Sequence, residues 1–150
     1  MNILGLLVDK GLLSKSDRAL VETELTKKGR SLADVLAGRG ISLTQALTIA
    51  GEAYGLPARI LGDPPANKEA FGYIPIDSAR HYGFVPLDII DGALDIGITD
   101  PDNIEAFDAL QFISGKIGMP YKITLITKED FDRVLDAYQN LSGEVEKALS

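Results

Sequence analysis

The chain has 150 residues, of which 45% are hydrophobic and 25% charged, and it carries a formal net charge of −7. This composition predicts a globular protein with one fair core or two small ones. The acidic charge argues against a nucleic-acid partner, because phosphates require a basic face. The absence of cysteine excludes disulfides, thiolate catalysis and cysteine-ligated zinc. With no apolar run long enough to span a bilayer and no signal peptide, the expected location is the cytoplasm.

The N-terminal part is expected to be helical, and its pattern occurs twice. A short apolar helix from Ile3 to Lys10 is expected to end at Gly11, and a capped, more polar helix follows up to Lys28. The same succession begins again at Ser31 and is interrupted by Gly40, 29 positions after Gly11. We interpret this as an internal duplication. Neither helix–glycine–helix repeat is large enough to bury its own apolar stripe, so both are predicted to pack as one four-helix unit.

The stretch after the helical repeats has the composition of a linker, because it contains Gly62-Asp63-Pro64-Pro65. The chain is therefore expected to divide there. The predicted parts are a duplicated helical subdomain at 1–57, a linker at 58–70, a small α/β subdomain at 71–140, and at 141–150 the start of a linker to a further part.

A β-hairpin is the clearest single feature of the second half. Two apolar runs, 84–90 and 93–99, flank Asp91-Gly92, the dipeptide best suited to a two-residue type I′ turn. Counting outward from this turn predicts the facing apolar pairs Ile89 with Leu94, Leu87 with Ile96, and Val85 with Ile98. The opposite face, with Asp88 facing Asp95 and Pro86 facing Gly97, is expected to see solvent.

Helices and a third strand are expected to complete this sheet. After a short helix from Ile76 to Tyr82 and the hairpin, a helix follows the cap cluster at 100–103 and ends at Ser114-Gly115, burying Ile104, Phe107, Leu110 and Ile113. The strand from Tyr121 to Ile126 then lies parallel to the second strand. A last helix carries an apolar stripe of Phe131, Val134, Leu135 and Tyr138. The predicted fold class is α+β: a helical subdomain of two helix-turn-helix repeats, then a small three-stranded sheet covered by helices.

The search for catalytic chemistry finds no constellation. No stretch matches a phosphate-binding loop ending in Gly-Lys-Ser or Gly-Lys-Thr, so the chain has no visible means of holding a nucleoside triphosphate. His81 is the single histidine and is interpreted as a surface or boundary residue rather than a catalytic base. The acids Asp88 and Asp95, and the cluster at 100–103, lack the further oxygen ligands of a cation site. We predict no catalytic and no metal residues, which favours a binding or docking module.

The order of several short motifs adds a resemblance. Those motifs are Tyr54-Gly55-Leu56-Pro57, Tyr73-Ile74-Pro75, Ala79-Arg80-His81-Tyr82, Val85-Pro86-Leu87, Gly92-Ala93-Leu94, Thr99-Asp100-Pro101 and Ala106-Phe107-Asp108-Ala109-Leu110-Gln111-Phe112. Together with the two helical repeats, this succession resembles the MshEN-like N-terminal domain of the type II secretion and type IV pilus assembly ATPases, the GspE and PilB group. The resemblance covers nearly the whole chain.

The resemblance implies a docking role. In that family the domain precedes a hexameric motor ATPase and docks it onto the cytoplasmic part of an inner-membrane platform or adaptor protein. The domain itself is then not an enzyme, although the parent protein is expected to be a homohexameric ATPase. The implied location is cytoplasmic, peripheral to the bacterial inner membrane through that partner, with no nucleic acid bound.

Some members of the family also bind cyclic di-GMP through the duplicated helices, using an Arg-Leu-Gly and a Gln in each repeat. Aligned on the repeat glycines, the arginine positions hold Asn2 and Ser31, and the glycine and glutamine positions are also changed. No cofactor is therefore expected, and a cyclic di-GMP sensor remains the alternative. Its candidate residues are Arg30, Asn2, Ser31 and Lys28, within a basic groove that would also use Lys27 and Arg39.

Overall fold

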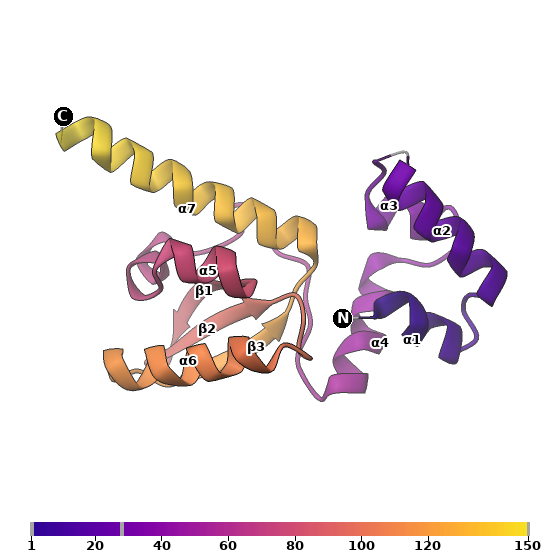
Figure 1. Ribbon diagram of the computed structural model, residues 1–150, viewed down its shortest axis with the longest axis horizontal. Coiled ribbons are helices and arrows are strands. Elements are labelled where there is room, and N and C mark those ends of the chain that lie inside the picture. Colours follow the sequence, from indigo (N-terminus) through magenta and orange to yellow (C-terminus); the bar gives the residue numbers. More distant parts are fainter. Residues whose placement is uncertain (1, 28, 150) are drawn as a thin grey trace. The chain divides into compact units, whose positions relative to one another are not determined.

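The computed structural model describes residues 2–27 and 29–149, with side chains described up to residue 141. It divides into two compact units, Met1–Arg59 and Ile60–Ser150 (Figure 1). We call them the helical unit and the α/β unit. The helical unit contains α1 (Ile3–Asp9), α2 (Lys15–Lys27), α3 (Leu32–Ala37) and α4 (Leu43–Tyr54).

The helical unit repeats its local geometry. Asn2 caps α1 and Ser31 caps α3, and each side-chain oxygen accepts a hydrogen bond of 3.1 Å from the backbone N–H three residues further on. Gly11 and Gly40 follow these helices with the same φ of +76°, a conformation that glycine adopts without a steric penalty. The two repeats thus begin and end in the same way, as the predicted duplication requires.

One hydrophobic core joins the four helices of this unit. The buried residues that form it are Leu4, Leu7, Leu13, Val21, Val35, Leu36, Ile41 and Ala46. Because every helix of the unit contributes to this cluster, neither repeat has a separate core. The prediction of one packed four-helix unit is confirmed.

The α/β unit is built around a three-stranded sheet (Figure 1). Its elements are a 3-10 helix η1 (Lys68–Tyr73), α5 (Ile76–Tyr82), β1 (Phe84–Ile90), β2 (Ala93–Ile98), α6 (Ile104–Ile117), β3 (Tyr121–Leu125) and α7 (Lys128–Leu149). The strand order is β1-β2-β3, with β1 antiparallel and β3 parallel to β2. The parallel pair requires the crossover helix α6. The predicted α+β class is confirmed.

The hairpin turn is as predicted, but its register is not. Asp91 and Gly92 have φ angles of +52° and +76°, as a type I′ turn requires, and the pairs next to the turn are as expected. A bulge between Pro86 and Asp88 then inserts Leu87 as an extra residue in β1. The remaining pairs are Pro86 with Ile96, Val85 with Gly97, and Phe84 with Ile98. The predicted pairs of Leu87 with Ile96, Val85 with Ile98, and Pro86 with Gly97 were therefore wrong.

The second face of the sheet is buried, which corrects the prediction that it sees solvent. Every residue of β2 is buried, and Asp95 is only 4% exposed. Its carboxylate accepts a hydrogen bond of 2.8 Å from the Thr124 hydroxyl of β3. A Cβ on Gly97 would lie 2.8 Å from the Cδ1 atom of Ile126, so the absence of a side chain makes room for this residue, which follows β3. A central strand buried on both faces explains this pattern.

Helix α6 also differs from the sequence prediction. It continues past Ser114-Gly115 to Ile117 and ends at Gly118, which has a φ of +70°. Its buried residues are Ala106 and Leu110, whereas Ile104 is 74% exposed. The first residue of the predicted apolar stripe therefore does not face the core.

The segment before η1 is fastened to α7. The N–H of Leu61 donates to the Asp130 carboxylate at 2.8 Å, and the Arg133 guanidinium donates to the carbonyl oxygen of Gly62 at 2.7 Å. The Tyr138 hydroxyl donates to the carbonyl oxygen of Phe71 at 2.6 Å. Part of the stretch expected to be a linker thus packs within the α/β unit. The backbone of α7 continues to Leu149, and the start of a linker at 141–150 stays a prediction.

Candidate functional site

A small cleft lies on the helical unit, and we call it the N-terminal cleft. Its volume is about 450 Å³. Its lining residues come from α1, the beginning of α2 and the end of α4: Asn2, Gly5, Leu6, Val8, Asp9, Lys15, Arg18 and Tyr54. The cleft is lined by two cations, Lys15 and Arg18, and by the Asp9 carboxylate. The Glu22 carboxylate pairs with Arg18 at 3.1 Å, so the formal charges of this group balance.

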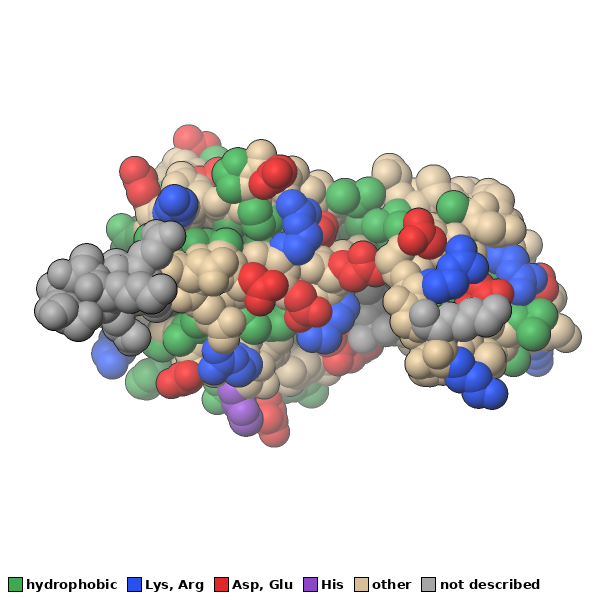
Figure 2. Space-filling model, turned by 90° about the horizontal axis from the view of Figure 1, so that it is seen from above, with side chains coloured by type: hydrophobic (Ala, Val, Ile, Leu, Met, Phe, Trp, Pro, Cys, Tyr) green, Lys and Arg blue, Asp and Glu red, His purple; other side chains and the backbone are tan. Residues whose placement is uncertain are grey.

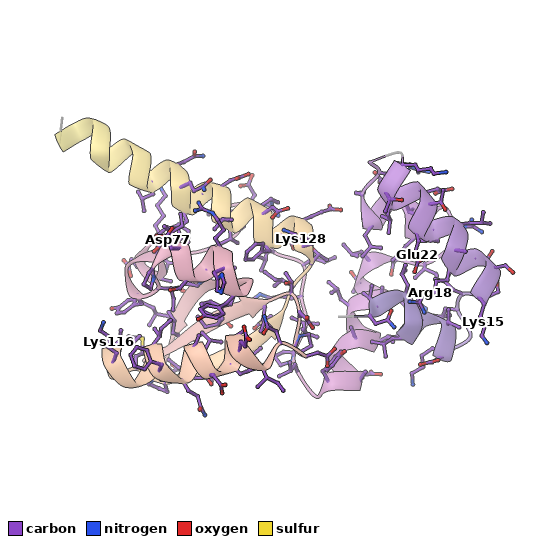
Figure 3. The ribbon with its side chains drawn as sticks, in the orientation of Figure 1. Lys15, Arg18, Glu22, Asp77, Lys116 and Lys128 are labelled. Carbon is purple, nitrogen blue, oxygen red and sulfur yellow. The ribbon has the colours of Figure 1, made fainter. Side chains whose placement is uncertain are left out.

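Arg18 is the central polar residue of the N-terminal cleft. Its Nη2 donates to the Asn2 side-chain oxygen at 3.0 Å, and its Nε donates to the Glu22 carboxylate at 3.1 Å. Figure 3 shows Arg18 between Lys15 and Glu22 along α2. The same Asn2 oxygen caps α1, so one amide orients the guanidinium against the beginning of that helix. A guanidinium held in this way is suited to a phosphate or carboxylate.

The structure places the sequence-predicted nucleotide residues apart. Only Asn2 lines the N-terminal cleft, whereas Ser31 caps α3 and the Arg30 guanidinium lies 3.4 Å from the Glu24 carboxylate. Lys28 lies outside the described residues. Arg39, a further member of the predicted basic groove, forms an ion pair of 2.9 Å with Asp17.

Sequence reasoning missed the two cations of the cleft. Lys15 and Arg18 follow the cap at Ser14, whose hydroxyl accepts a hydrogen bond of 3.0 Å from the backbone N–H of Asp17. Residues three apart on a helix lie on one face, so the cap and the spacing together carry a signal for this pair. That Tyr54, at the end of α4, lines the same cleft could be recognised only from the tertiary structure.

The acidic residues that the structure describes do not assemble into a cation site. Among the residues that the structure describes, no group of three or more His, Cys, Asp or Glu side chains is arranged to hold a metal. Asp88 accepts hydrogen bonds from the Asn67 amide at 3.1 Å and from the Ile89 N–H at 2.8 Å, and Asn103 caps α6. His81 is exposed, as Figure 2 shows, and contacts the Tyr82 ring edge-on.

A larger, mostly apolar groove lies on the α/β unit between α5 and α6, and we call it the α5–α6 groove. Its volume is about 840 Å³. One wall is α6, represented by Glu105, Asp108, Ala109, Phe112, Ile113 and Lys116. The other wall consists of Tyr73, Pro75, Ser78 and Tyr82. Phe112 is 71% exposed, so the groove presents a large aromatic side chain to solvent.

The described helices include none that is both long enough and apolar enough to cross a bilayer. This finding concerns only residues 2–27 and 29–149.

With both surfaces described, the chain can be placed among known proteins: it belongs to the MshEN domain family, which matches residues 54–145. The type IV pilus assembly ATPase PilB of Myxococcus xanthus (strain DK1622) is 29% identical to it over 111 residues, which is 73% of this chain and 20% of that protein. The chain thus spans about a fifth of the length of this curated relative.

Two solved structures share the fold. A structure of MshE with cdg has a TM-score of 0.61 and 22% identity, covering 92% of this chain and 99% of that one. The N-terminal domain of XpsE has a TM-score of 0.54 and 23% identity, covering 90% of this chain and 92% of that one. At these identities the likeness concerns the fold alone.

The family assignment confirms the resemblance to the N-terminal domain of type II secretion and type IV pilus ATPases. Domains of this type are non-catalytic, and the ATPase activity belongs to separate domains of the parent proteins. The matched range contains the whole α5–α6 groove, but only Tyr54 of the N-terminal cleft.

Proposed function

We propose that this chain is a docking and regulatory domain of a secretion or pilus assembly ATPase, and that it binds the cytoplasmic part of an inner-membrane platform or adaptor protein through the α5–α6 groove. The observation that carries the proposal is the open apolar groove with Phe112 exposed at 71%. Exposed apolar surface of this kind is typical of interaction sites.

The wider setting is part of the same proposal. The parent protein is a homohexameric ATPase assembled through its motor domain, and this domain lies in the cytoplasm, held at the inner membrane by its partner. The helical part up to residue 57 and the small α/β part at 71–140 are then separate functional segments, and the stretch from 141 leads to the motor.

The test is a titration of the full chain with the purified cytoplasmic domain of the platform protein from the same organism. Phe112→Ala is expected to weaken binding roughly tenfold, because a buried aromatic anchor dominates many interfaces. The matched control is Ile104→Ala, which removes a side chain on the same helix that is 74% exposed but lies outside the groove. Equal losses in both variants, or no binding by the unchanged chain, would contradict the proposal.

A second candidate function is supported by the N-terminal cleft. We infer that, if this domain binds cyclic di-GMP, the dinucleotide lies in the cleft with Lys15 and Arg18 facing its phosphates. The hydrogen bond from Arg18 to Asn2 favours this site, because it brings a guanidinium to the first of the two positions at which the family motif has an arginine. The fold likeness to MshE with cdg, which we take to mean cyclic di-GMP, agrees with it.

Isothermal titration with cyclic di-GMP at moderate salt tests this second candidate. We expect Arg18→Gln to abolish measurable binding, whereas Arg30→Ala leaves it unchanged because Arg30 lies outside the cleft and pairs with Glu24. No heat from the unchanged chain at high nucleotide concentration would exclude the sensor function and leave docking as the function to pursue. Loss of binding in Arg30→Ala alone would instead favour the basic groove expected from the sequence.

A further inference from the structure

We propose that the occupant of the α5–α6 groove is an amphipathic helix of the partner, with lysine or arginine residues beside its apolar stripe. This inference rests on the proposed docking function and specifies the partner's chemistry at the same site.

The walls of the groove have the periodicity of two facing helices. The lining residues of α6 recur at intervals of three and four, from Glu105 to Ile117. This stripe extends over roughly 18 Å, or about three helical turns. On the opposite wall, Pro75, Ser78 and Tyr82 recur at the same kind of interval. Both walls therefore present side chains at helical spacing, and a third helix can fill the space between two such walls with its own apolar stripe.

The apolar side chains of the groove are suited to anchoring such a helix. Phe112 is largely exposed from α6, and Tyr73 and Tyr82 contribute aromatic rings from the other wall. The Tyr82 ring stacks on the fully buried Phe84, with 5.6 Å between the ring centroids. Because Phe84 belongs to the core, this contact holds one wall in place, which lowers the entropic cost of binding.

The charges along α6 indicate which charge the partner carries at this site. Glu105 and Asp108 lie three residues apart at the N-terminal half of the groove, and Lys116 lies towards the other end of α6 (Figure 3). Within the described part of the chain, neither acid forms an ion pair. Both carboxylates are thus available to an incoming cation, and complementary charge selects partners and orients them.

The experiment uses two synthetic helical peptides of about 14 residues, long enough for three to four turns. Both carry the same Leu and Phe stripe, and they differ only in having two lysines or two glutamates beside one end of it. Binding to the full chain is measured by fluorescence anisotropy. The lysine peptide is expected to bind roughly fivefold more tightly, as two partly exposed ion pairs imply.

Substitutions in the groove test whether the peptides bind there. The double variant Glu105→Lys, Asp108→Lys is expected to reverse the preference, and Phe112→Ala to weaken both peptides. The matched control is Asp77→Lys on α5, because Asp77 is exposed but does not line the groove. Glu105 and Asp108 are exposed, so these changes leave the core intact, which circular dichroism checks.

Each outcome bears on the proposal. The proposal is overturned if the two peptides bind equally, if neither binds at millimolar concentration, or if Phe112→Ala changes nothing. An apolar dye that fills the groove and is not displaced by the lysine peptide would indicate a small-molecule site instead. If the platform domain still binds through Phe112 while the peptides show no preference, docking stands and only the helical, basic character of the partner is wrong.

Discussion

The two units of this chain reach a stable core by different means. The helical unit repeats one small device, a capped helix stopped by a glycine, and shares a single core between the two copies. The α/β unit instead buries one strand, β2, on both faces and surrounds it with segments distant in the sequence. A core built from local repeats depends on caps and turns, whereas a core built from distant segments depends on close packing.

The surfaces of the two units also differ. The cleft of the helical unit is polar and contains Arg18 held by Asn2, while the groove of the α/β unit is apolar and contains an exposed Phe112. A nucleotide is proposed for the first and another protein for the second. Four substitution experiments test the contrast between the two cores.

The largest effect is expected from Phe84→Ala. Phe84 is fully buried in β1, and truncating a buried phenylalanine costs about 3–5 kcal/mol. The change should lower hydrogen-exchange protection throughout the α/β unit and leave α1 to α4 protected. The matched variant Leu36→Ala, at a fully buried leucine of the helical unit, should do the reverse. If each variant lowers hydrogen-exchange protection in both units, the chain unfolds as one cooperative body.

Alanine substitutions at two glycines compare how well the two cores tolerate an added methyl group. A Cβ on Gly51 in α4 would lie 2.6 Å from the backbone oxygen of Leu56, while the atoms nearest to a Cβ on Gly97 in β2 would be side-chain carbons of Ile126 and Leu87. Backbone yields less readily than a methyl group, so we expect Gly51→Ala to cost about 2 kcal/mol and Gly97→Ala about 1 kcal/mol. Urea unfolding of the two variants measures the difference. The opposite order would show that the sheet is the tighter of the two.

Tyr138→Phe tests a polar contact of the α/β unit. The Tyr138 hydroxyl donates to the carbonyl oxygens of Phe71 and Ile74, and its loss should cost about 1 kcal/mol. Burial raises the pKa of Tyr138 above the ordinary value of 10.0. The folded state therefore holds this proton more tightly, so the stabilisation is complete below pH 10 and is lost as the pH rises further. Unfolding measured between pH 8 and 11 should show a shallower alkaline decline in the variant than in the unchanged chain.

The smallest effect is expected at the helix caps. Ser31→Ala removes the exposed side chain that accepts from the Asp34 N–H and should cost about 0.5 kcal/mol. Ser42→Ala, which removes the cap of α4, should cost a similar amount. Ser16→Ala, in the first turn of α2, is the control and should be nearly neutral. Thermal unfolding in the far ultraviolet measures all three, and a neutral Ser31→Ala would mean that the repeat does not depend on its caps.

Local signals in the sequence predicted most of the elements. The turn at Asp91-Gly92, the caps at Ser31 and Asn103, and the left-handed glycine at position 40 each depend on a few neighbouring residues, and the structure contains all of them, although α3 already ends at Ala37. The same holds for the crossover between β2 and β3, because a helix between two strands makes them parallel.

Contacts between distant segments were beyond the same reasoning. The bulge at Leu87 coincides with a hydrogen bond of 2.7 Å from the Asn67 N–H to the Leu87 carbonyl oxygen, and nothing local in β1 indicates it. The burial of Asp95 depends on Thr124 from the neighbouring strand. In the candidate site, the sequence indicated Asn2 but not Arg18, because their contact joins the beginnings of two helices.

The hydrogen bonds of Asp130 and Arg133 have a mechanical consequence. They fasten residues 61 and 62, where the chain enters the α/β unit, to the first turns of α7, where it leaves the sheet. A pulling force applied between residue 60 and the middle of α7 would first load these few bonds, before it reached the strands. The sheet, and the groove beside it, would keep their shape until these hydrogen bonds broke.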